Sequence, residues 1–248
     1  MPLPCPRSLK AKAIVVVILA ASLLVFSMSV LSYFNVLVCF GPGGTDYSIH
    51  GVDVSRHQGQ IDWTVVSASG IRFAFIKATE GGDYVDEKFI ENWHKAAESN
   101  IHRGAYHVFT YCRSGSEQAA NFIDNVPLDR YSLRPAADLS SGDKCRDQLD
   151  DDLLLREFSV FRREVEQKFG APPILYSSGN SRLTRLLNSE GTRLEWVRGL
   201  FVDPNWFYGN EWTIWQYSTR GQVNGIVGNV DMNVFRGKEN ELRLIMIR

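Results

Sequence analysis

The stretch "LRPAADLSSGDKC", Leu133 to Cys145, contains an apolar run that ends in an acid and then opens into a small polar loop. Ala136 and Ala137 precede Asp138, and Ser140 follows that acid by two residues. Side chains at positions i and i+2 of a strand point the same way. The stretch therefore predicts a buried strand that presents Asp138 and Ser140 on one side of its carboxyl end.

Short apolar runs alternate with helical patterns along the rest of the chain. We predict strands at 47–55, 71–78, 102–109, a run ending at Asp138, 172–177, 194–203, 211–218 and 228–235. We predict helices at 61–70, 86–100, 115–125, within 147–169 and at 181–188. About eight strands with helices between the early ones favour an α/β fold, an incomplete (β/α)8 barrel, because the last third has few helical patterns.

The N-terminal segment 13–40 has no charged residue, and Arg7, Lys10 and Lys12 precede it. Roughly 20 apolar residues cross a bilayer, whereas the apolar core of a signal peptide runs to about 15. We therefore predict a cytoplasmic N-terminus at 1–12, a transmembrane signal-anchor helix at 13–40 and a linker at 41–46. A cleaved signal peptide is the alternative, and in both cases the remainder is exported.

Composition and cysteine content limit the possible partners and the compartment. The chain has 248 residues, 44% hydrophobic and 22% charged, with a formal net charge of -1, so we expect no nucleic-acid partner. Cys112 and Cys145 lie in the part expected to be exported, where an oxidising compartment permits a disulfide. Two unpaired buried thiols are the alternative, and the sequence does not decide between them.

Several acids and one histidine fall at or near the carboxyl ends of the predicted strands. In (β/α)8 barrels the loops at those ends build the active site. Carboxylates gathered there suggest glycoside chemistry, in which one carboxyl group protonates the leaving oxygen and another stabilises an oxocarbenium-like state. Acids at strand ends also cap helices and hold loops, so that alternative stays open. The residues are Asp53, Glu80, His107, Asp138, Asp203 and Asp231.

Five motifs follow one another along the chain: "HGVDVSRHQGQIDW", "FAFIKATEGGDYVD", "RGAYHVF", "WTIWQYS" and "GNVDMNVFRG". In this order they resemble the motifs of glycoside hydrolase family 25, the Chalaropsis-type lysozymes or N-acetylmuramidases. The resemblance implies a flattened, incomplete (β/α)8 barrel at 47–240, followed by a C-terminal tail at 241–248. It also implies hydrolysis of the β-1,4 bond between N-acetylmuramic acid and N-acetylglucosamine in peptidoglycan, without a metal or organic cofactor.

Carried over by position, the resemblance makes Asp53, Asp138 and Asp231 the catalytic carboxylates. The family has a glutamate two residues after the acid on the fourth strand, and that glutamate acts as the general acid. Here Ser140 stands in its place. A serine hydroxyl does not donate a proton at neutral pH, and general acid catalysis is worth about 10²–10⁴-fold.

Three interpretations of Ser140 remain open. The chain keeps the fold and the glycan groove with little or no hydrolase activity, as a membrane-tethered peptidoglycan-binding protein. Alternatively, another carboxylate supplies the proton, with Asp143 and Glu80 as the first candidates and Asp203 and Glu211 as the others. The third interpretation is that the assignment has slipped in this loop, or that the sequence departs locally from its working form.

Further candidates for substrate binding lie near the same strand ends, because aromatic faces pack on pyranose rings. We predict this role for Tyr106, His107, Asp203, Trp215 and Tyr217. Barrel core is the alternative for the aromatic residues, since the sequence does not show which strand face points inward. Lys77 and Glu80 are expected to form an internal ion pair. No metal site is expected, since no further His or Cys sits at ligand spacing.

The partner that the resemblance implies is bacterial peptidoglycan. With the predicted anchor, it places the chain in a bacterial inner membrane as a single-pass protein whose barrel faces the periplasm or the outside. A secreted form after signal cleavage is the alternative. We expect a monomer.

Overall fold

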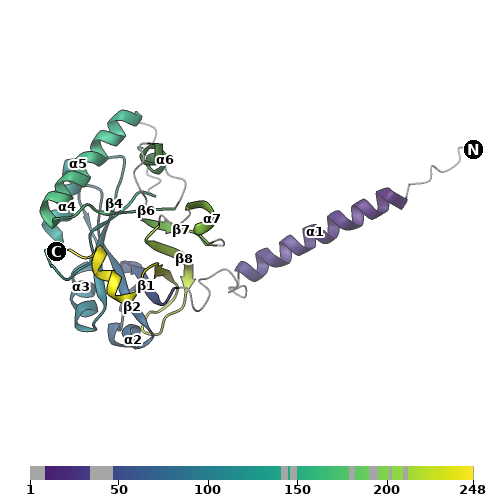
Figure 1. The fold of residues 1–248 in the computed structure, drawn as a ribbon, viewed down its shortest axis with the longest axis horizontal. Helices are drawn as coiled ribbons and strands as arrows, with labels where there is room; N and C mark the ends of the chain where they lie inside the picture. The colour runs from purple at the N-terminus through teal and green to yellow at the C-terminus, as the bar shows by residue number, and fades with distance from the viewer. Residues whose placement is uncertain are drawn as a thin grey trace, which may run out of the picture. The chain divides into compact units, whose positions relative to one another are not determined.

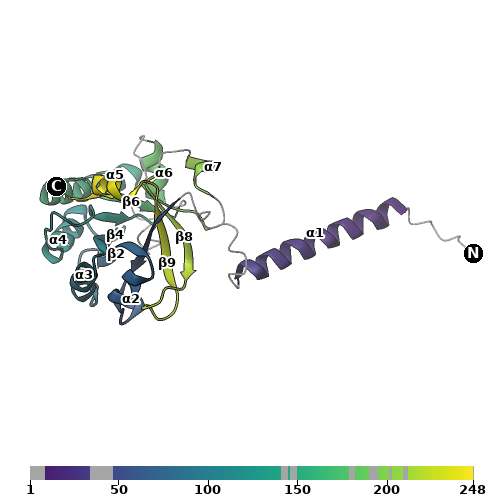
Figure 2. The same ribbon diagram turned by 60° about the horizontal axis from the view of Figure 1, so that its bottom comes forward.

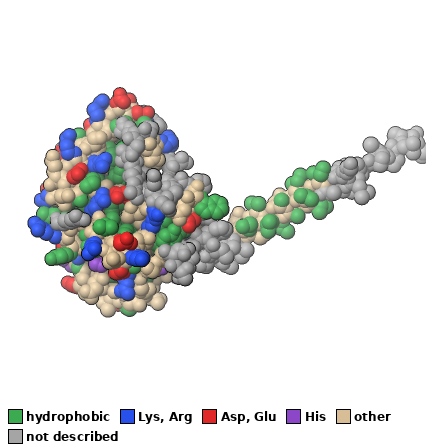
Figure 3. Space-filling view, viewed as in Figure 1, with side chains coloured by type: hydrophobic (Ala, Val, Ile, Leu, Met, Phe, Trp, Pro, Cys, Tyr) green, Lys and Arg blue, Asp and Glu red, His purple; other side chains and the backbone are tan. Residues whose placement is uncertain are grey.

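The computed structural model describes residues 9–33, 47–140, 145, 150–178, 182–189, 195–200, 203–208 and 212–247. The chain divides into two compact units, Met1–Phe40 and Gly41–Arg248. In the first unit, α1 (Leu9–Tyr33) is a continuous helix whose described side chains, at 14–30, are exposed and largely hydrophobic (Figure 3). Among the described residues, no helix is long and apolar enough to cross a bilayer, so the transmembrane helix predicted at 13–40 is not supported.

The second unit is a closed barrel. Eight strands form a ring in the order β1-β9-β8-β7-β6-β5-β4-β2, and pairing of β1 with β2 completes it (Figure 1). The ring strands are β1 (Ile49–Val54), β2 (Ile71–Glu80), β4 (His102–Val108), β5 (Ala136–Asp138), β6 (Ile174–Ser177), β7 (Trp196–Arg198), β8 (Ile214–Gly221) and β9 (Val230–Phe235). The short strand β3 (Tyr84–Val85) pairs only with β2, as a hairpin. The α/β barrel predicted from the alternating pattern is confirmed.

Helices lie between the strands along the chain and outside the ring (Figures 1 and 2). They are α2 (Trp63–Ala68), α3 (Phe89–Glu98), α4 (Gly115–Asn125), α5 (Asp151–Phe169), α6 (Arg182–Ser189) and the one-turn α7 (Asn205–Tyr208). Their ends follow local sequence signals. Helix α4, for example, begins with a capping box of Ser114 and Glu117, and α5 ends at Gly170, whose φ is 75°.

Strand β9 differs from the other ring strands in direction. It is antiparallel to both of its neighbours, β8 and β1, whereas the remaining neighbouring pairs of the ring are parallel. The connection 222–229 between β8 and β9 is fully described and contains no helix. A parallel crossover needs about a dozen residues or more, so this short connection makes a hairpin instead. The (β/α)8 pattern is therefore incomplete at this point, as the sequence predicted.

Two hydrophobic clusters lie on the two faces of the ring. Because successive strand side chains point to opposite faces, Phe73 and Phe75 of β2 face the barrel interior, while Ala74 and Ile76 face the helices. All four are fully buried. The barrel interior is thus a packed core, and polar chemistry is confined to its ends. On the face shown in Figure 3, basic and acidic side chains of this unit are interspersed.

A 3₁₀ segment near the C-terminus, η3 (Glu239–Ile245), closes one end of the barrel. Its Leu242 and Ile245 are buried within the interior cluster. Leu133, just before β5, forms a bridge with Met246. Since Leu133 precedes a parallel strand, η3 lies at the amino ends of the parallel strands. The domain boundary predicted between 240 and 241 falls inside this segment.

Leu242→Ala should lower the free energy of unfolding by about 2–5 kcal/mol, because it removes a fully buried side chain from a packed core. Leu244 is the matched control, since it lies in the same segment and is 59% exposed. Leu244→Ala should change stability by less than about 0.5 kcal/mol. Urea unfolding of the full chain measures both, and equal losses would show that η3 does not plug the barrel.

Candidate active site

Polar side chains gather inside the barrel at the end opposite η3. Asp53 of β1 lies between Val52 and Val54, which both face the helices, so its side chain faces the interior. The same alternation turns four more polar side chains inward: Asp138 of β5, Gln216 of β8, and Asp231 and Asn233 of β9. Asp53 and Asp231 are direct cross-strand partners. Three of the predicted carboxylates therefore share one end of the barrel.

Two amide side chains hold the Asp53 carboxyl group. Asn233 Nδ2 donates to Asp53 Oδ2 at 2.7 Å, and Gln216 Nε2 donates to the same oxygen at 2.9 Å. A further hydrogen bond to its oxygen sets the orientation of each amide. Tyr176 Oη donates to Gln216 Oε1 at 2.8 Å. Trp196 Nε1 likewise donates to Asn233 Oδ1 at 2.8 Å. With both amide oxygens occupied, the amino groups must face the acid.

The two acids of this pair do not ionise together. Burial raises the pKa of Asp53, and the neighbouring Asp231 carboxylate raises it further. Burial also raises the pKa of Asp231, while the hydrogen bond from Asp53 and the charge of Arg198 oppose that rise. Two adjacent buried carboxyl groups share a proton because the doubly charged state is costly. The pKa of Asp53 is therefore raised, and the pair holds one proton between its two carboxyl groups.

Ser140 lies against Asp138, on the side predicted from its i+2 position. The Ser140 backbone N–H donates to Asp138 Oδ1 at 2.8 Å, and the Ser140 hydroxyl donates to the same oxygen at 2.5 Å. Burial raises the pKa of Asp138, whereas the two bonds from Ser140 and the charge of Lys77 oppose that rise. The hydroxyl is thus engaged with the neighbouring acid, and no second carboxyl group stands at this position.

Two cations act on the acids. Lys77 donates to Glu80 at 2.6 Å, which is the ion pair expected from the sequence, and its charge also acts on Asp138. Arg198 of β7 acts on Asp231. Arg198, Gln216 and Asn233 were not among the residues predicted for the site. Strand alternation could have identified Asn233, since it lies two residues after Asp231 and therefore on the same face.

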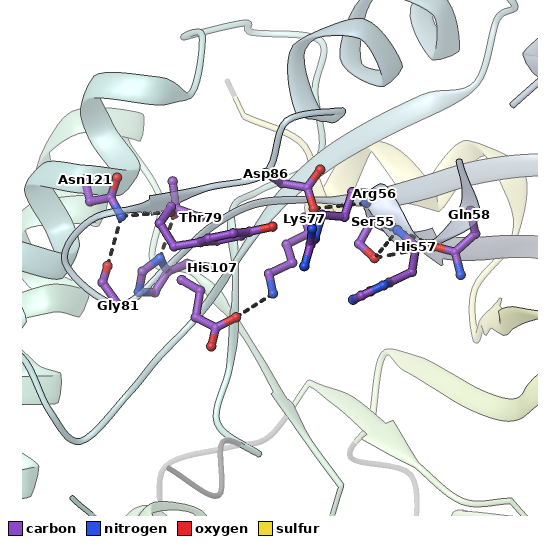
Figure 4. Close-up of polar contacts among 12 residues, drawn as sticks. Ser55, Arg56, His57, Gln58, Lys77, Thr79, Gly81, Asp86, His107 and Asn121 are labelled. Atoms are coloured by element: carbon purple, nitrogen blue, oxygen red, sulfur yellow. Dashed lines mark hydrogen bonds and ion pairs between the residues drawn. The ribbon is translucent and has the colours of Figure 1, made fainter. Parts of the chain in front are cut away.

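Three predicted substrate-binding residues face away from the acids. Trp215 is buried in the outer cluster, and its Nε1 donates to the Gly199 carbonyl at 2.8 Å. Tyr217 packs against the same cluster. His107 is buried between the sheet and α4, where it is bound to Thr79 Oγ1 at 2.7 Å (Figure 4). Its ring stacks on that of Phe161. Burial lowers the pKa of His107 to about 3, so it stays neutral. The structure thus places these three side chains on the outer face of the ring, a face that the sequence alone could not assign.

The remaining predictions differ in outcome. Tyr106 packs against the interior cluster. Burial raises the pKa of its hydroxyl, and the charges of Asp53 and Asp138 raise it further. Asp203 accepts a hydrogen bond from the Asn205 N–H at 2.8 Å, where α7 begins. Its side chain therefore has a structural role there. Asp143 and Glu211, named as alternative acids, lie outside the described residues.

The disulfide between Cys112 and Cys145 is present, with the two Cα atoms 5.1 Å apart. It joins the segment after β4 to the segment that follows Ser140. Among the residues that the structure describes, no group of three or more His, Cys, Asp or Glu side chains is placed to hold a metal ion.

A family model described as glycosyl hydrolases family 25 matches residues 52–226, most of the barrel. The chain belongs to glycosyl hydrolase family 25. Lysozyme M1 of Streptomyces globisporus is 32% identical over 216 residues, which are 82% of this chain and 72% of that protein. The protein YegX of Escherichia coli strain K12 is 39% identical over 202 residues, 79% of this chain and 73% of that protein.

Solved structures of family 25 share the fold. The family 25 glycosyl hydrolase from Bacillus anthracis has a TM-score of 0.70 and 32% identity, covering 83% of this chain and 96% of that one. A bacterial lysozyme from Streptomyces coelicolor has a TM-score of 0.68 and 29% identity, covering 80% and 97%. Family 25 lysozymes are glycosidases, so the carboxyl groups at the open end of this barrel lie in a glycosidase fold.

The buried acid pair gives this family 25 barrel a distinct dependence of stability on pH. The pKa of Asp53 is raised from 3.8 to about 8, so between these values the folded chain holds a proton that the unfolded chain has lost. The stability that this proton contributes is present at low pH and is lost as pH rises through that window. Asp53→Asn keeps a neutral side chain at every pH and should remove the loss, up to about 1.4 kcal/mol per pH unit.

Urea unfolding of the full chain at pH 5, 6, 7 and 8 measures this effect as the difference between natural chain and variant. Asp124→Asn is the control, since Asp124 is exposed on α4, and its curve should follow that of the natural chain. If the Asp53→Asn curve also runs parallel to the natural one, Asp53 is already ionised in the folded chain at pH 5.

Proposed function

We propose that this chain binds peptidoglycan glycan strands across the open end of its barrel, and that its hydrolysis of them is strongly reduced. Membership of the lysozyme family and the retained carboxyl groups Asp53, Asp138 and Asp231 support the substrate class. The proposal of reduced hydrolysis rests on Ser140. Its hydroxyl is bound to Asp138, at the position where the family resemblance implies a general acid.

The missing proton donor limits the reaction at one definite step. The bond in question is the β-1,4 link between N-acetylmuramic acid and N-acetylglucosamine, whose leaving oxygen must be protonated as the bond breaks. A serine hydroxyl stays protonated at neutral pH and has no acidic proton to give. A loss of about 10²–10⁴-fold in rate follows from removing general acid catalysis.

The remaining polar groups can still bind a sugar. Asp138 can accept hydrogen bonds from sugar hydroxyl groups and, when ionised, stabilises positive charge at an anomeric carbon. Its Oδ1 is engaged by Ser140, which leaves Oδ2 to face a ligand. Asp53 and its partner Asp231 form a preorganised group held by Gln216 and Asn233. Such a site binds a glycan without needing the acid that cleaves it.

A second candidate is a working lysozyme with a substitute acid. Glu80 favours it among the described residues, because its side chain is 42% exposed at the carboxyl end of β2. The Glu80 carboxylate is, however, already held by the ammonium group of Lys77 at 2.6 Å. The other named acid, Asp143, lies outside the described residues.

We also propose that the barrel works outside the cytoplasm. The Cys112–Cys145 disulfide supports this location, since disulfides persist in oxidising compartments. A bacterial periplasm, reached with an inner-membrane anchor at 13–40 or after signal cleavage, remains a prediction from the sequence, as does the monomeric state. Full-length chain in the membrane fraction would indicate the uncleaved anchor, whereas a shortened chain in the soluble fraction would indicate cleavage.

Release of reducing ends from purified peptidoglycan tests the function. The natural full chain should release them slowly or not at all, and Ser140→Glu should raise the rate by about 10²–10⁴-fold because it restores a proton donor beside Asp138. Ser140→Gln is the matched control, since glutamine has the size of glutamate and no acidic proton. It should leave the rate unchanged.

Binding is measured alongside, by co-sedimentation of each form with insoluble peptidoglycan. The natural chain should bind. A natural chain that cleaves as fast as Ser140→Glu would overturn the proposal in favour of a substitute acid, and Glu80→Gln and Asp143→Asn would then identify it. A natural chain that neither binds nor cleaves would remove peptidoglycan as the ligand.

A further inference from the structure

A separate cavity of about 410 Å³ opens beside the acids. Its lining comes from the turn after β1, the end of β2, the β2–β3 hairpin and the segment after β4, and includes Arg56, Lys77, Glu80, Asp83, Tyr84 and Arg113. Lys77 connects it to the site described above, because its ammonium group bonds to Glu80 and its charge acts on Asp138. A ligand in the cavity would therefore adjoin a glycan at the acids.

The charges around this cavity do not cancel. Lys77 pairs with Glu80 at 2.6 Å, and Arg113 pairs with Asp83 at 3.1 Å. The Arg56 guanidinium forms no ion pair with any carboxylate of the described residues, and Arg56 is exposed. One guanidinium is thus left to bind an anion. A guanidinium binds a carboxylate through two parallel hydrogen bonds, which gives both strength and direction.

An aromatic ring lies between the cations. The Arg56 guanidinium is 5.9 Å from the centroid of the Tyr84 ring, and Lys77 Nζ is 5.1 Å from it. Pairing of Tyr84 with Glu80 in the β2–β3 hairpin brings the ring to this place. The cavity therefore offers an apolar surface beside a free positive charge, which suits a ligand with both aliphatic and carboxylate groups.

Hydrogen bonds, one of them buried and the others partly buried, hold the cavity walls (Figure 4). Asn121 Nδ2 of α4 donates to the carbonyl oxygens of Gly81 and Tyr84, at 3.0 and 3.1 Å. The Arg56 N–H donates to Asp86 Oδ2 at 3.0 Å, and the Ser55–Gln58 capping box holds the turn that carries Arg56. Because its backbone is held at both ends, the cavity is present before a ligand binds.

We propose that this cavity binds the acidic peptide stem carried by N-acetylmuramic acid, with Arg56 contacting a stem carboxylate. The proposal rests on the proposed glycan site and adds the substrate class to it. Sugar hydroxyl and acetamido groups are neutral and do not call for a free guanidinium. The peptide stem is the part of a peptidoglycan strand that combines carboxylates with aliphatic side chains, and it projects sideways from the sugar. The chain thus selects strands that still carry their peptides.

The test is isothermal titration of the full chain with two soluble probes. The first is the disaccharide of N-acetylglucosamine and N-acetylmuramic acid with its peptide stem, which lacks the bond that the family cleaves. The second is the same disaccharide after amidase removal of the stem, which leaves the lactyl carboxylate. Arg56→Gln should weaken binding of the first probe by about tenfold or more and leave that of the second unchanged.

Arg72→Gln is the matched control, since Arg72 is exposed at the opposite end of β2, and it should change neither affinity. Equal weakening of both probes by Arg56→Gln would assign the contact to the sugars that the probes share, and weakening of the second probe alone would assign it to the lactyl carboxylate. Either result would overturn the contact with the stem. Equal affinity of the natural chain for the two probes would overturn the inference and leave the glycan site standing. If neither probe binds, the proposed function fails and the inference fails with it.

Discussion

The antiparallel pairing of β9 between β1 and β8 is the constraint on which the site depends. It closes the barrel and, in the same register, places Asp231 opposite Asp53 and Asn233 opposite Gln216. Two carboxyl groups this close are costly to bury, and the cost is offset by a shared proton and by amides whose orientation is fixed from behind. Folding of the ring and assembly of the acid pair are therefore one event.

This arrangement explains how the barrel tolerates serine at position 140. Among the described residues, the hydrogen bonds of Ser140 go to Asp138, and none of them reaches the network of Asp53, Gln216 and Asn233. Under the proposed function, loss of the proton donor would lower the rate of hydrolysis and leave the hydrogen bonds of Asp53 in place. Binding and hydrolysis would then be separable properties of this fold.

The sequence predicted the fold better than it predicted the orientation of individual side chains. Alternation of strands and helices was enough for the barrel, and the i+2 relation placed Ser140 beside Asp138. Trp215 and Tyr217 were predicted to bind the ligand because aromatic rings pack on sugars, and only the ring shows that Gln216 between them points inward. The face on which His107 lies was likewise not readable from the sequence. The direction of β9 depends on the short connection 222–229, which carries no periodic signal.

The plug formed by η3 also constrains how a polymer can approach. With Leu242 and Ile245 buried in the interior cluster, the barrel axis is filled at the amino end. Under the proposed function, a glycan strand would therefore lie across the opposite end and extend away on both sides. Such a strand would need no free terminus to bind, so the number of places that the protein could occupy would grow with strand length.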